Sequence, residues 1–229
     1  MIYAENILLC IAVPLLITLF FLRGNARRCI ASLLIGMIAC LLAAYISGYL
    51  QLVTGSTEHN TAVFLSPIVE ELLKCMPLLL YLLLAPKENE LLIASVAIGA
   101  GFATFENCCH LLSVGASSLL FVLIRGLAVG VMHIVCTTAL ALGLMVCRRH
   151  RALTIAGILG ALSLAVGFHG LYNLLVSVEG CSSYVGYALP IITAAALSFL
   201  FQRLYPGEDG SSRPSVQEPG QDLPESPPQ

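Results

Sequence analysis

The stretch "SPIVEELLK", residues 66–74, places two adjacent glutamates and a lysine inside an apolar run that extends from Ala62 to Ala85. A run of this length is sufficient to cross a bilayer, which takes about 20 mainly apolar residues. A charged side chain at the centre of a bilayer costs about 2.5–3.5 kcal/mol on insertion scales. Glu70, Glu71 and Lys74 therefore predict a polar functional site within the membrane.

The composition indicates a membrane protein. Of the 229 residues, 58% are hydrophobic and only 10% are charged, and the mean hydropathy is +0.91. A soluble domain needs more charge to cover its surface. The net charge of −2 comes with no basic face, so no nucleic-acid partner is expected. The N-terminal segment lacks a basic region and an obvious cleavage site, which predicts a retained helix.

Apolar segments separated by short polar loops predict an all-α, polytopic membrane helix bundle. We expect seven transmembrane helices, at residues 5–22, 29–52, 62–85, 91–113, 119–147, 152–178 and 184–204. The basic residues at the ends of the spans flank the odd-numbered loops and the end of the last span, and the even-numbered loops contain no lysine or arginine; these residues are Arg23, Arg27, Arg28, Lys87, Arg148, Arg149, Arg151 and Arg203. By the positive-inside rule, the N-terminus lies outside and the C-terminus in the cytoplasm.

Residues 1–204 thus form the predicted transmembrane domain, and residues 205–229 form a tail rich in Pro, Gly, Ser and acidic residues. Such a composition cannot bury enough apolar surface to fold, so we expect a disordered cytoplasmic tail. Gly126 and Gly130 form a G-x-x-x-G motif, which predicts close helix packing. Gly99 and Gly101 are expected to let the fourth span approach its neighbours closely. The nine cysteines include no C-x-x-C pair, which argues against a zinc knuckle or a thioredoxin-like motif, and their spacing predicts no disulfide framework.

Polar residues recur in four consecutive predicted spans. From the predicted topology, Glu70 lies about 12 Å and Glu106 about 10 Å below the outer surface. His169 lies about 13 Å and His133 about 15–20 Å below it. Four helices therefore bring ionisable residues to a similar depth, which predicts one convergent site made of Glu70, Glu71, Lys74, Glu106, Asn107, His110, Arg125, His133, His169 and Asn173.

Helical spacing suggests local pairs within this set. Glu70 and Lys74 are separated by four residues, a favourable order for an ion pair, and so are Glu106 with His110 and His169 with Asn173. Glu71 projects about 100° away from Glu70, so one glutamate is expected to pair with Lys74 and the other to face a reactant.

Structural roles are the alternatives for several of these residues. The pair formed by Glu71 and Lys74 is alternatively an internal ion pair that makes a buried charge tolerable. Arg125 is alternatively a snorkelling cation, and His110 a solvated residue at the interface. Asn107 is alternatively a bridge between helices.

Glutamate and histidine together can activate water in two ways. In the first, a carboxylate acts as general base while histidine and asparagine donate to the oxyanion. In the second, Glu and His side chains hold Zn²⁺ with one position open for water; the candidate ligands are Glu70, Glu106, His133 and His169. The sequence contains no H-E-x-x-H motif, and both schemes stay open at this point.

Four segments in order, "SPIVEELLK", "IGAGFATFEN", "HIVCTTALALGL" and "GFHGLYNLL", resemble the PrsW family of intramembrane proteases. That family is related to the type II CAAX prenyl proteases and to the APH-1 subunit of gamma-secretase. The resemblance covers residues 60 to 180 and implies a multi-spanning peptidase in the cell membrane. Its substrates would be membrane-embedded or membrane-adjacent proteins, such as a single-span regulator, within the membrane lipid.

By this resemblance, the first glutamate of the Glu70–Glu71 pair is the water-activating base, and His169 with Asn173 helps to hold the oxyanion. Glu106 and His133 match the family's Phe-Glu and first histidine motifs. Founding-type members read F-E-x-x-E, whereas this chain has Cys109 in place of the second glutamate. A role of that second acid is therefore absent here or has moved to His110.

Two other functions remain open from the sequence. A non-catalytic scaffold like APH-1 would use the same polar residues to tie helices together. An ion-coupled transporter also places Glu and His within the membrane, although the sequence contains no inverted repeat and no matched pair of broken helices.

Overall fold

The computed structural model describes residues 4–84, 87–115, 118–149 and 154–204. These residues form helices and no strand: α1 (Ala4–Phe21), α2 (Gly24–Thr54), α3 (Glu58–Asn60), the π-helical turn η1 (Thr61–Leu65), α4 (Ser66–Leu84), α5 (Glu88–Val114), α6 (Leu119–Arg149), α7 (Thr154–Ser177) and α8 (Cys181–Leu204). The predicted all-α fold class is confirmed. The predicted tail, residues 205–229, lies outside the described residues, so its disorder stays a prediction.

Six of the described helices are long and apolar enough to cross a membrane: α1, α2, α5, α6, α7 and α8. α4 has 19 residues and contains Glu70, Glu71 and Lys74. Together with η1 it forms a continuous helical segment from Thr61 to Leu84. The six helices confirm a polytopic membrane bundle, while a seventh crossing by α4 and the direction of insertion remain predictions.

Packing divides the chain after Ala195 into two parts. Residues 4–195 contain the helix bundle and all the site residues described below. From Ala196 onward, the structure describes only the last turns of α8, which ends at Leu204.

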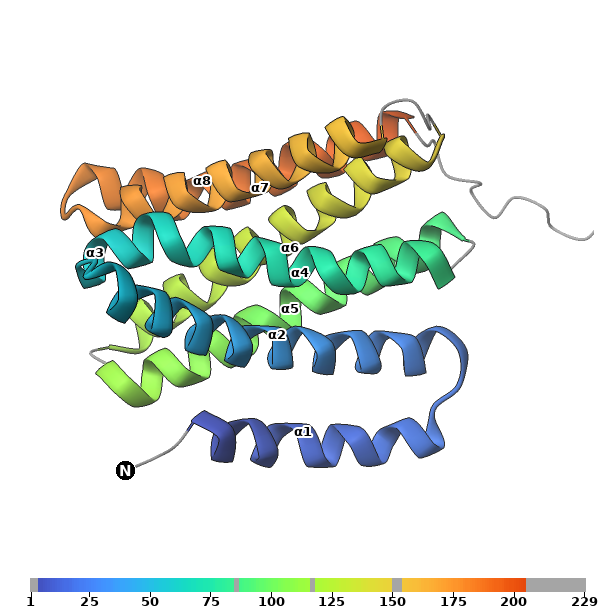
Figure 1. The fold of residues 1–229 in the computed structure, drawn as a ribbon, viewed down its shortest axis with the longest axis horizontal. Helices are drawn as coiled ribbons and strands as arrows, with labels where there is room; N and C mark the ends of the chain where they lie inside the picture. Colours follow the sequence, from blue (N-terminus) through green and yellow to red (C-terminus); the bar gives the residue numbers. More distant parts are fainter. Residues whose placement is uncertain (1–3, 85–86, 116–117, 150–153, 205–229) are drawn as a thin grey trace, which may run out of the picture. The chain divides into compact units, whose positions relative to one another are not determined.

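Helices of the first part run back and forth between two ends of the bundle (Figure 1). The beginning of α1, the short helix α3 and the turn between α7 and α8 lie at one end, and the turn between α1 and α2 lies at the other. α5 is central, because its contacts with α2 and α6 are the most extensive in the bundle. α4 contacts α2, α5, α6 and α7, so charged side chains on α4 can meet four other helices.

Glycines allow α5 to contact its neighbours through the backbone. A Cβ atom at Gly101 would lie 2.0 Å from the carbonyl oxygen of Leu33 on α2. A Cβ atom at Gly99 would lie 2.8 Å from the carbonyl oxygen of His133 on α6. The close approach predicted for Gly99 and Gly101 is therefore confirmed.

The G-x-x-x-G prediction for α6 is wrong for the described bundle. A Cβ atom at Gly126 or Gly130 would have no neighbour within 4 Å among the described residues beyond its own helix. α6 packs instead through another face, where Ala128, Val129 and Met132 are buried. Small residues permit close packing, but the larger apolar side chains determine which face of this helix is buried.

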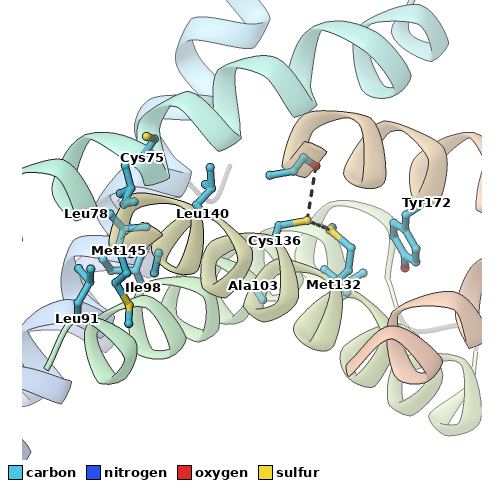
Figure 2. Close-up of a cluster of buried hydrophobic side chains, with 14 of the residues drawn as sticks. Cys75, Leu78, Leu91, Ile98, Ala103, Met132, Cys136, Leu140, Met145 and Tyr172 are labelled. Atoms are coloured by element: carbon cyan, nitrogen blue, oxygen red, sulfur yellow. Dashed lines mark hydrogen bonds between the residues drawn. The ribbon is translucent and has the colours of Figure 1, made fainter. Parts of the chain in front are cut away.

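Two apolar clusters hold the bundle together. The first joins α4, α5, α6 and α7 and includes Leu78, Ile98, Met132, Leu140 and Tyr172 (Figure 2). The second joins α1, α2, α4 and α5 and includes Leu34, Met37, Val69, Phe102 and Phe105. Residues of the site lie on the same helices, so these clusters fix the positions of the site side chains.

Candidate functional site

The helical period of α4 determines which of its charged residues are buried. Pro67, Glu71, Lys74 and Leu78 follow one another at intervals of four, three and four residues, and all are buried. This spacing places them on one face of the helix. Glu71 and Lys74 are 0% exposed, whereas the Glu70 side chain lies at the edge of this face and is 15% exposed.

Lys74 pairs with Glu71. Its Nζ lies 2.6 Å from Glu71 Oε1, and both side chains are fully buried. The predicted i, i+4 pair of Glu70 with Lys74 is thus replaced by an i, i+3 pair, because Glu71 shares the buried face with Lys74. This is the internal ion pair that the sequence offered as an alternative, and it leaves Glu70 as the glutamate without a lysine partner.

A chain of polar contacts continues from Lys74 to α6 and α5. Lys74 Nζ lies 2.8 Å from His133 Nδ1, and His133 Nε2 lies 2.6 Å from Glu106 Oε2. Because an ammonium group has only donors, His133 Nδ1 accepts, and Nε2–H of the neutral ring donates to Glu106. Phe102 closes this region, with its ring centroid 4.6 Å from Lys74 Nζ and 4.7 Å from the His133 ring.

His169 on α7 bridges the two glutamates of α4. Its Nδ1 lies 2.7 Å from Glu71 Oε1, and its Nε2 lies 3.8 Å from Glu70 Oε2. A carboxylate accepts, so Nδ1–H donates to Glu71, and the lone pair of the neutral ring is on Nε2. His169 therefore presents a basic nitrogen towards Glu70.

Arg125 and His110 lie at the margin of the site. Arg125 Nη2 lies 3.4 Å from Glu106 Oε1, which favours a structural ion pair. Half-buried His110 lines a smaller cavity of about 140 Å³ with Asn107 and Arg125. Among the described residues, no hydrogen bond or ion pair joins His110 to the other predicted site residues.

Asn173 holds the π-helical turn. Its Nδ2 donates to the carbonyl oxygen of Ala62 in η1 at 2.9 Å. Gly170, one turn earlier on α7, lies so close to η1 that a Cβ atom there would be 3.1 Å from Val63 O. The structure therefore places Asn173 on the backbone before α4, and the oxyanion role implied by the resemblance would require this bond to break.

A pocket of about 360 Å³ opens beside the site. Glu70 and Glu106 line it, and so do residues of α2 that sequence reasoning missed: Cys40, Ala43, Ala44, Ser47, Gly48 and Gln51. The small and polar residues of α2 recur at helical spacings of three and four, and this pattern could have indicated the pocket-lining face of α2. α2 thus supplies one side of the space in which a reactant would meet the two acids.

Three side chains of the polar network, of which Glu70 lines the pocket, could hold a metal ion. Ligand atoms of Glu70, His133 and His169 all lie within 4.8 Å of one another. Glu70 Oε2 is buried and has no hydrogen-bond partner among the described residues. Two imidazole nitrogens and a carboxylate oxygen suit Zn²⁺, and the Glu71 contact with His169 Nδ1 is the usual support of a histidine ligand. The chain's donors therefore fit a metal.

The geometry separates the predicted metal ligands. Glu106 does not belong to this group of three. Its Oε2 accepts a hydrogen bond from His133 Nε2 instead. The ring nitrogens of His133 both have partners, whereas His169 Nε2 faces Glu70 at 3.8 Å. Glu70 and His169 are thus ready to bind an ion, while His133 must exchange a hydrogen bond for it.

Comparison with known proteins is consistent with this site. A family model described as "PrsW family intramembrane metalloprotease" matches residues 25–200, which include the whole polar network. No curated protein and no solved structure matches the chain.

Proposed function

Because the chain belongs to the PrsW family of intramembrane metalloproteases, we propose that it is an endopeptidase that uses Glu70 to activate water. Its substrates would be membrane-embedded or membrane-adjacent proteins. The observation that carries this proposal is the environment of Glu70. Its Oε2 is buried, has no hydrogen-bond partner among the described residues, faces His169 Nε2 at 3.8 Å, and belongs to a residue that lines the pocket.

Glu70 is the base in this proposal because, among the described residues, Glu71 and Glu106 each accept side-chain hydrogen bonds and Glu70 accepts none, although Glu71 Oε2 is also buried without a hydrogen-bond partner. Glu71 Oε1 accepts from Lys74 and His169, and Glu106 Oε2 accepts from His133. Glu70 would take a proton from water as the water oxygen attacks the peptide carbonyl carbon. The same proton would pass to the leaving amine nitrogen when the C–N bond breaks.

The other residues position these groups. Glu71 and Lys74 fix the ring of His169 so that Nε2 points to Glu70. Glu106 and Lys74 fix His133, whose ring centroid lies 5.0 Å from that of His169. In the metal-dependent alternative of this proposal, Glu70, His169 and His133 would bind zinc, which would polarise the water and the carbonyl group, and Glu70 would then act as a ligand and not as the base. The proposal thus has a glutamate-dependent form and a metal-dependent form.

We further propose that α4 is a seventh span, with the α3 end of the bundle outside the cell membrane and residues 205–229 in the cytoplasm. The supporting observation is the clean separation of basic residues between odd and even loops. In this orientation the end of the pocket lined by Glu58 of α3 would lie towards the extracytoplasmic side. A single-span membrane protein with a short extracytoplasmic segment would be a suitable substrate.

A cleavage assay tests the proposal. The purified full chain is reconstituted with a library of designed single-span substrates, and cleavage is followed by mass spectrometry. We expect Glu70→Gln to lower kcat by at least about 10² and His169→Ala to abolish cleavage. The matched control is Glu179→Gln, which removes an exposed carboxylate in the turn between α7 and α8. Equal turnover by Glu70→Gln and the control would refute the role of Glu70.

A scaffold function is the second candidate, because the buried network joins α4, α5, α6 and α7 through direct contacts. A scaffold predicts that Glu70→Gln alters thermal stability or partner assembly and that the wild-type chain shows no proteolysis. Comparing the melting temperature and the cleavage rate of the same variants separates the two functions.

A further inference from the structure

The pocket extends beyond the two acids along α2 to Glu58 of α3. Ala43, Ala44 and Gly48 form part of its α2 side, and Gln51 and Glu58 also line it. Its opposite side includes Thr61 and Ala62 of η1. Hydrolysis at Glu70 does not require these groups, so they are available to recognise a ligand.

Two buried hydroxyl groups in this pocket lack partners. Ser47 and Thr61 are each 6% exposed, and neither Ser47 Oγ nor Thr61 Oγ1 has a hydrogen-bond partner among the described residues. A buried hydroxyl without a partner is unfavourable, and a ligand with complementary groups would recover the lost hydrogen bonds. A helix satisfies its own backbone groups, whereas an unwound peptide has free N–H and C=O groups to offer.

The charges of the pocket are all negative. Its described lining contains Glu58, Glu70 and Glu106 and no lysine, arginine or histidine. Glu106 is paired with His133 and Arg125, and Glu70 is the proposed base. Glu58 is exposed and makes no ion pair with a described residue. It is therefore the carboxylate best placed to attract a cationic group that enters the pocket.

We propose that this pocket receives an unwound stretch of the substrate and selects a lysine or arginine side chain in it, with Glu58 as the specificity-determining carboxylate. The inference rests on the proposed protease function and adds a feature of the substrate. Ser47 and Thr61 would bind the peptide backbone, and the cationic side chain would lie on the α3 side of the cleaved bond.

Binding tests this subsite without relying on turnover. Three designed single-span peptides differ only in carrying Lys, Gln or Glu at one position flanking the apolar segment, and the position is moved along the flank in a series. Fluorescence anisotropy with the purified full chain gives each Kd, and mass spectrometry verifies that the bound peptide is intact. At the best position we expect the Lys peptide to bind about fivefold more tightly than the Gln peptide, the range of a solvent-exposed ion pair.

Charge reversal at Glu58 provides the decisive comparison. Glu58→Lys should invert the order, so that the Glu peptide binds best, and Glu58→Gln should bring the Lys and Gln peptides to equal Kd. Glu179→Gln, which changes an exposed carboxylate that does not line the pocket, should keep the wild-type order. Equal Kd values for all three peptides at every position, or an order that Glu58→Lys leaves unchanged, would overturn the subsite.

Cleavage of the same peptides distinguishes this proposal from the proposed function. Cleavage that is indifferent to the test residue and to Glu58 overturns the subsite and leaves the protease function standing. Reversal of binding by Glu58→Lys without cleavage of any peptide supports the subsite and contradicts the protease function.

Discussion

Replacing Lys74 by methionine tests whether the buried network is a single coupled unit. Methionine keeps most of the side-chain volume, but it removes the contact with Glu71 at 2.6 Å, the contact with His133 at 2.8 Å and the cation–π contact with Phe102 at 4.6 Å. Among the described residues, His169 would then be the one remaining hydrogen-bond partner of Glu71 Oε1, in a fully buried carboxylate. We expect an uncompensated charge in the interior of the bundle.

The expected loss of stability follows from the burial of both partners. Breaking a buried ion pair by removing one partner costs about 3–5 kcal/mol. Since Lys74 and Glu71 are both 0% exposed, solvent screening does not reduce this figure. For a protein of this size, about 3–5 kcal/mol corresponds to a decrease in Tm of roughly 6–20 °C.

The assay is thermal unfolding of the detergent-purified protein followed by circular dichroism. The control is Glu90→Gln, which breaks the Arg28–Glu90 pair at 2.8 Å, where the side chains are 28% and 19% exposed. That pair is expected to contribute less than about 1 kcal/mol. The double variant Glu71→Gln/Lys74→Met should lie within about 2 kcal/mol of wild type, because it leaves no unpaired charge. A Tm for Lys74→Met equal to that of the control would refute the reasoning.

Three further predictions follow from the backbone contacts and the candidate ligands. Gly99→Ala should lower kcat in the cleavage assay more than tenfold, because the added Cβ would lie 2.8 Å from the carbonyl oxygen of His133 and would displace that turn of α6. Gly130→Ala is the control and should keep wild-type kcat, because its Cβ would have no neighbour within 4 Å. Asn173→Ala should lower the free energy of unfolding by about 1–3 kcal/mol, because the Ala62 carbonyl loses its donor; an unchanged Tm with lost activity would instead favour an oxyanion role. Elemental analysis should find about one zinc ion per chain, lost on chelation and in His169→Ala; active protein without metal would favour the glutamate scheme.

Sequence reasoning identified the charged helix but could not choose between its two acids. Spacing alone allows Lys74 to meet either Glu70 or Glu71. The choice depends on which face of α4 turns inward, and that face is set by contacts with His133 and His169 on other helices. Local spacing contains no information about those partners, which lie 59 and 98 residues away from their contacts on α4.

The apolar segments were the most predictable part of the fold. The predicted span 62–85 corresponds to η1 and α4, which together cover Thr61–Leu84. α2 begins at Gly24, before the predicted start at residue 29, because the first turns of the helix include the polar residues Arg27 and Arg28. Polar residues are compatible with a helix end at the membrane surface, so hydropathy locates the apolar core of a span better than its ends.

The pocket was not predictable in the same way. Ser47 and Gln51 lie in a span that reads as ordinary apolar helix, and their relation to Glu70 exists only after α2 has packed beside α4. The G-x-x-x-G motif at Gly126 is the opposite case, because the sequence predicted a helix contact there and the described bundle has none. In both cases the outcome depends on which face of the helix packs against its neighbours.

The π-helical turn before α4 sets the rotational phase of the two glutamates. A π turn contains one residue more than the α-helical turn it replaces, and each residue in an α-helix advances the chain by about 100°. Deleting one residue from Thr61–Leu65 while α7 still grips this segment through Asn173 would turn Glu70 and Glu71 by about that angle. Deletion of one residue outside the charged motif would thus turn Glu70 and Glu71 away from His169 without changing any of these three residues.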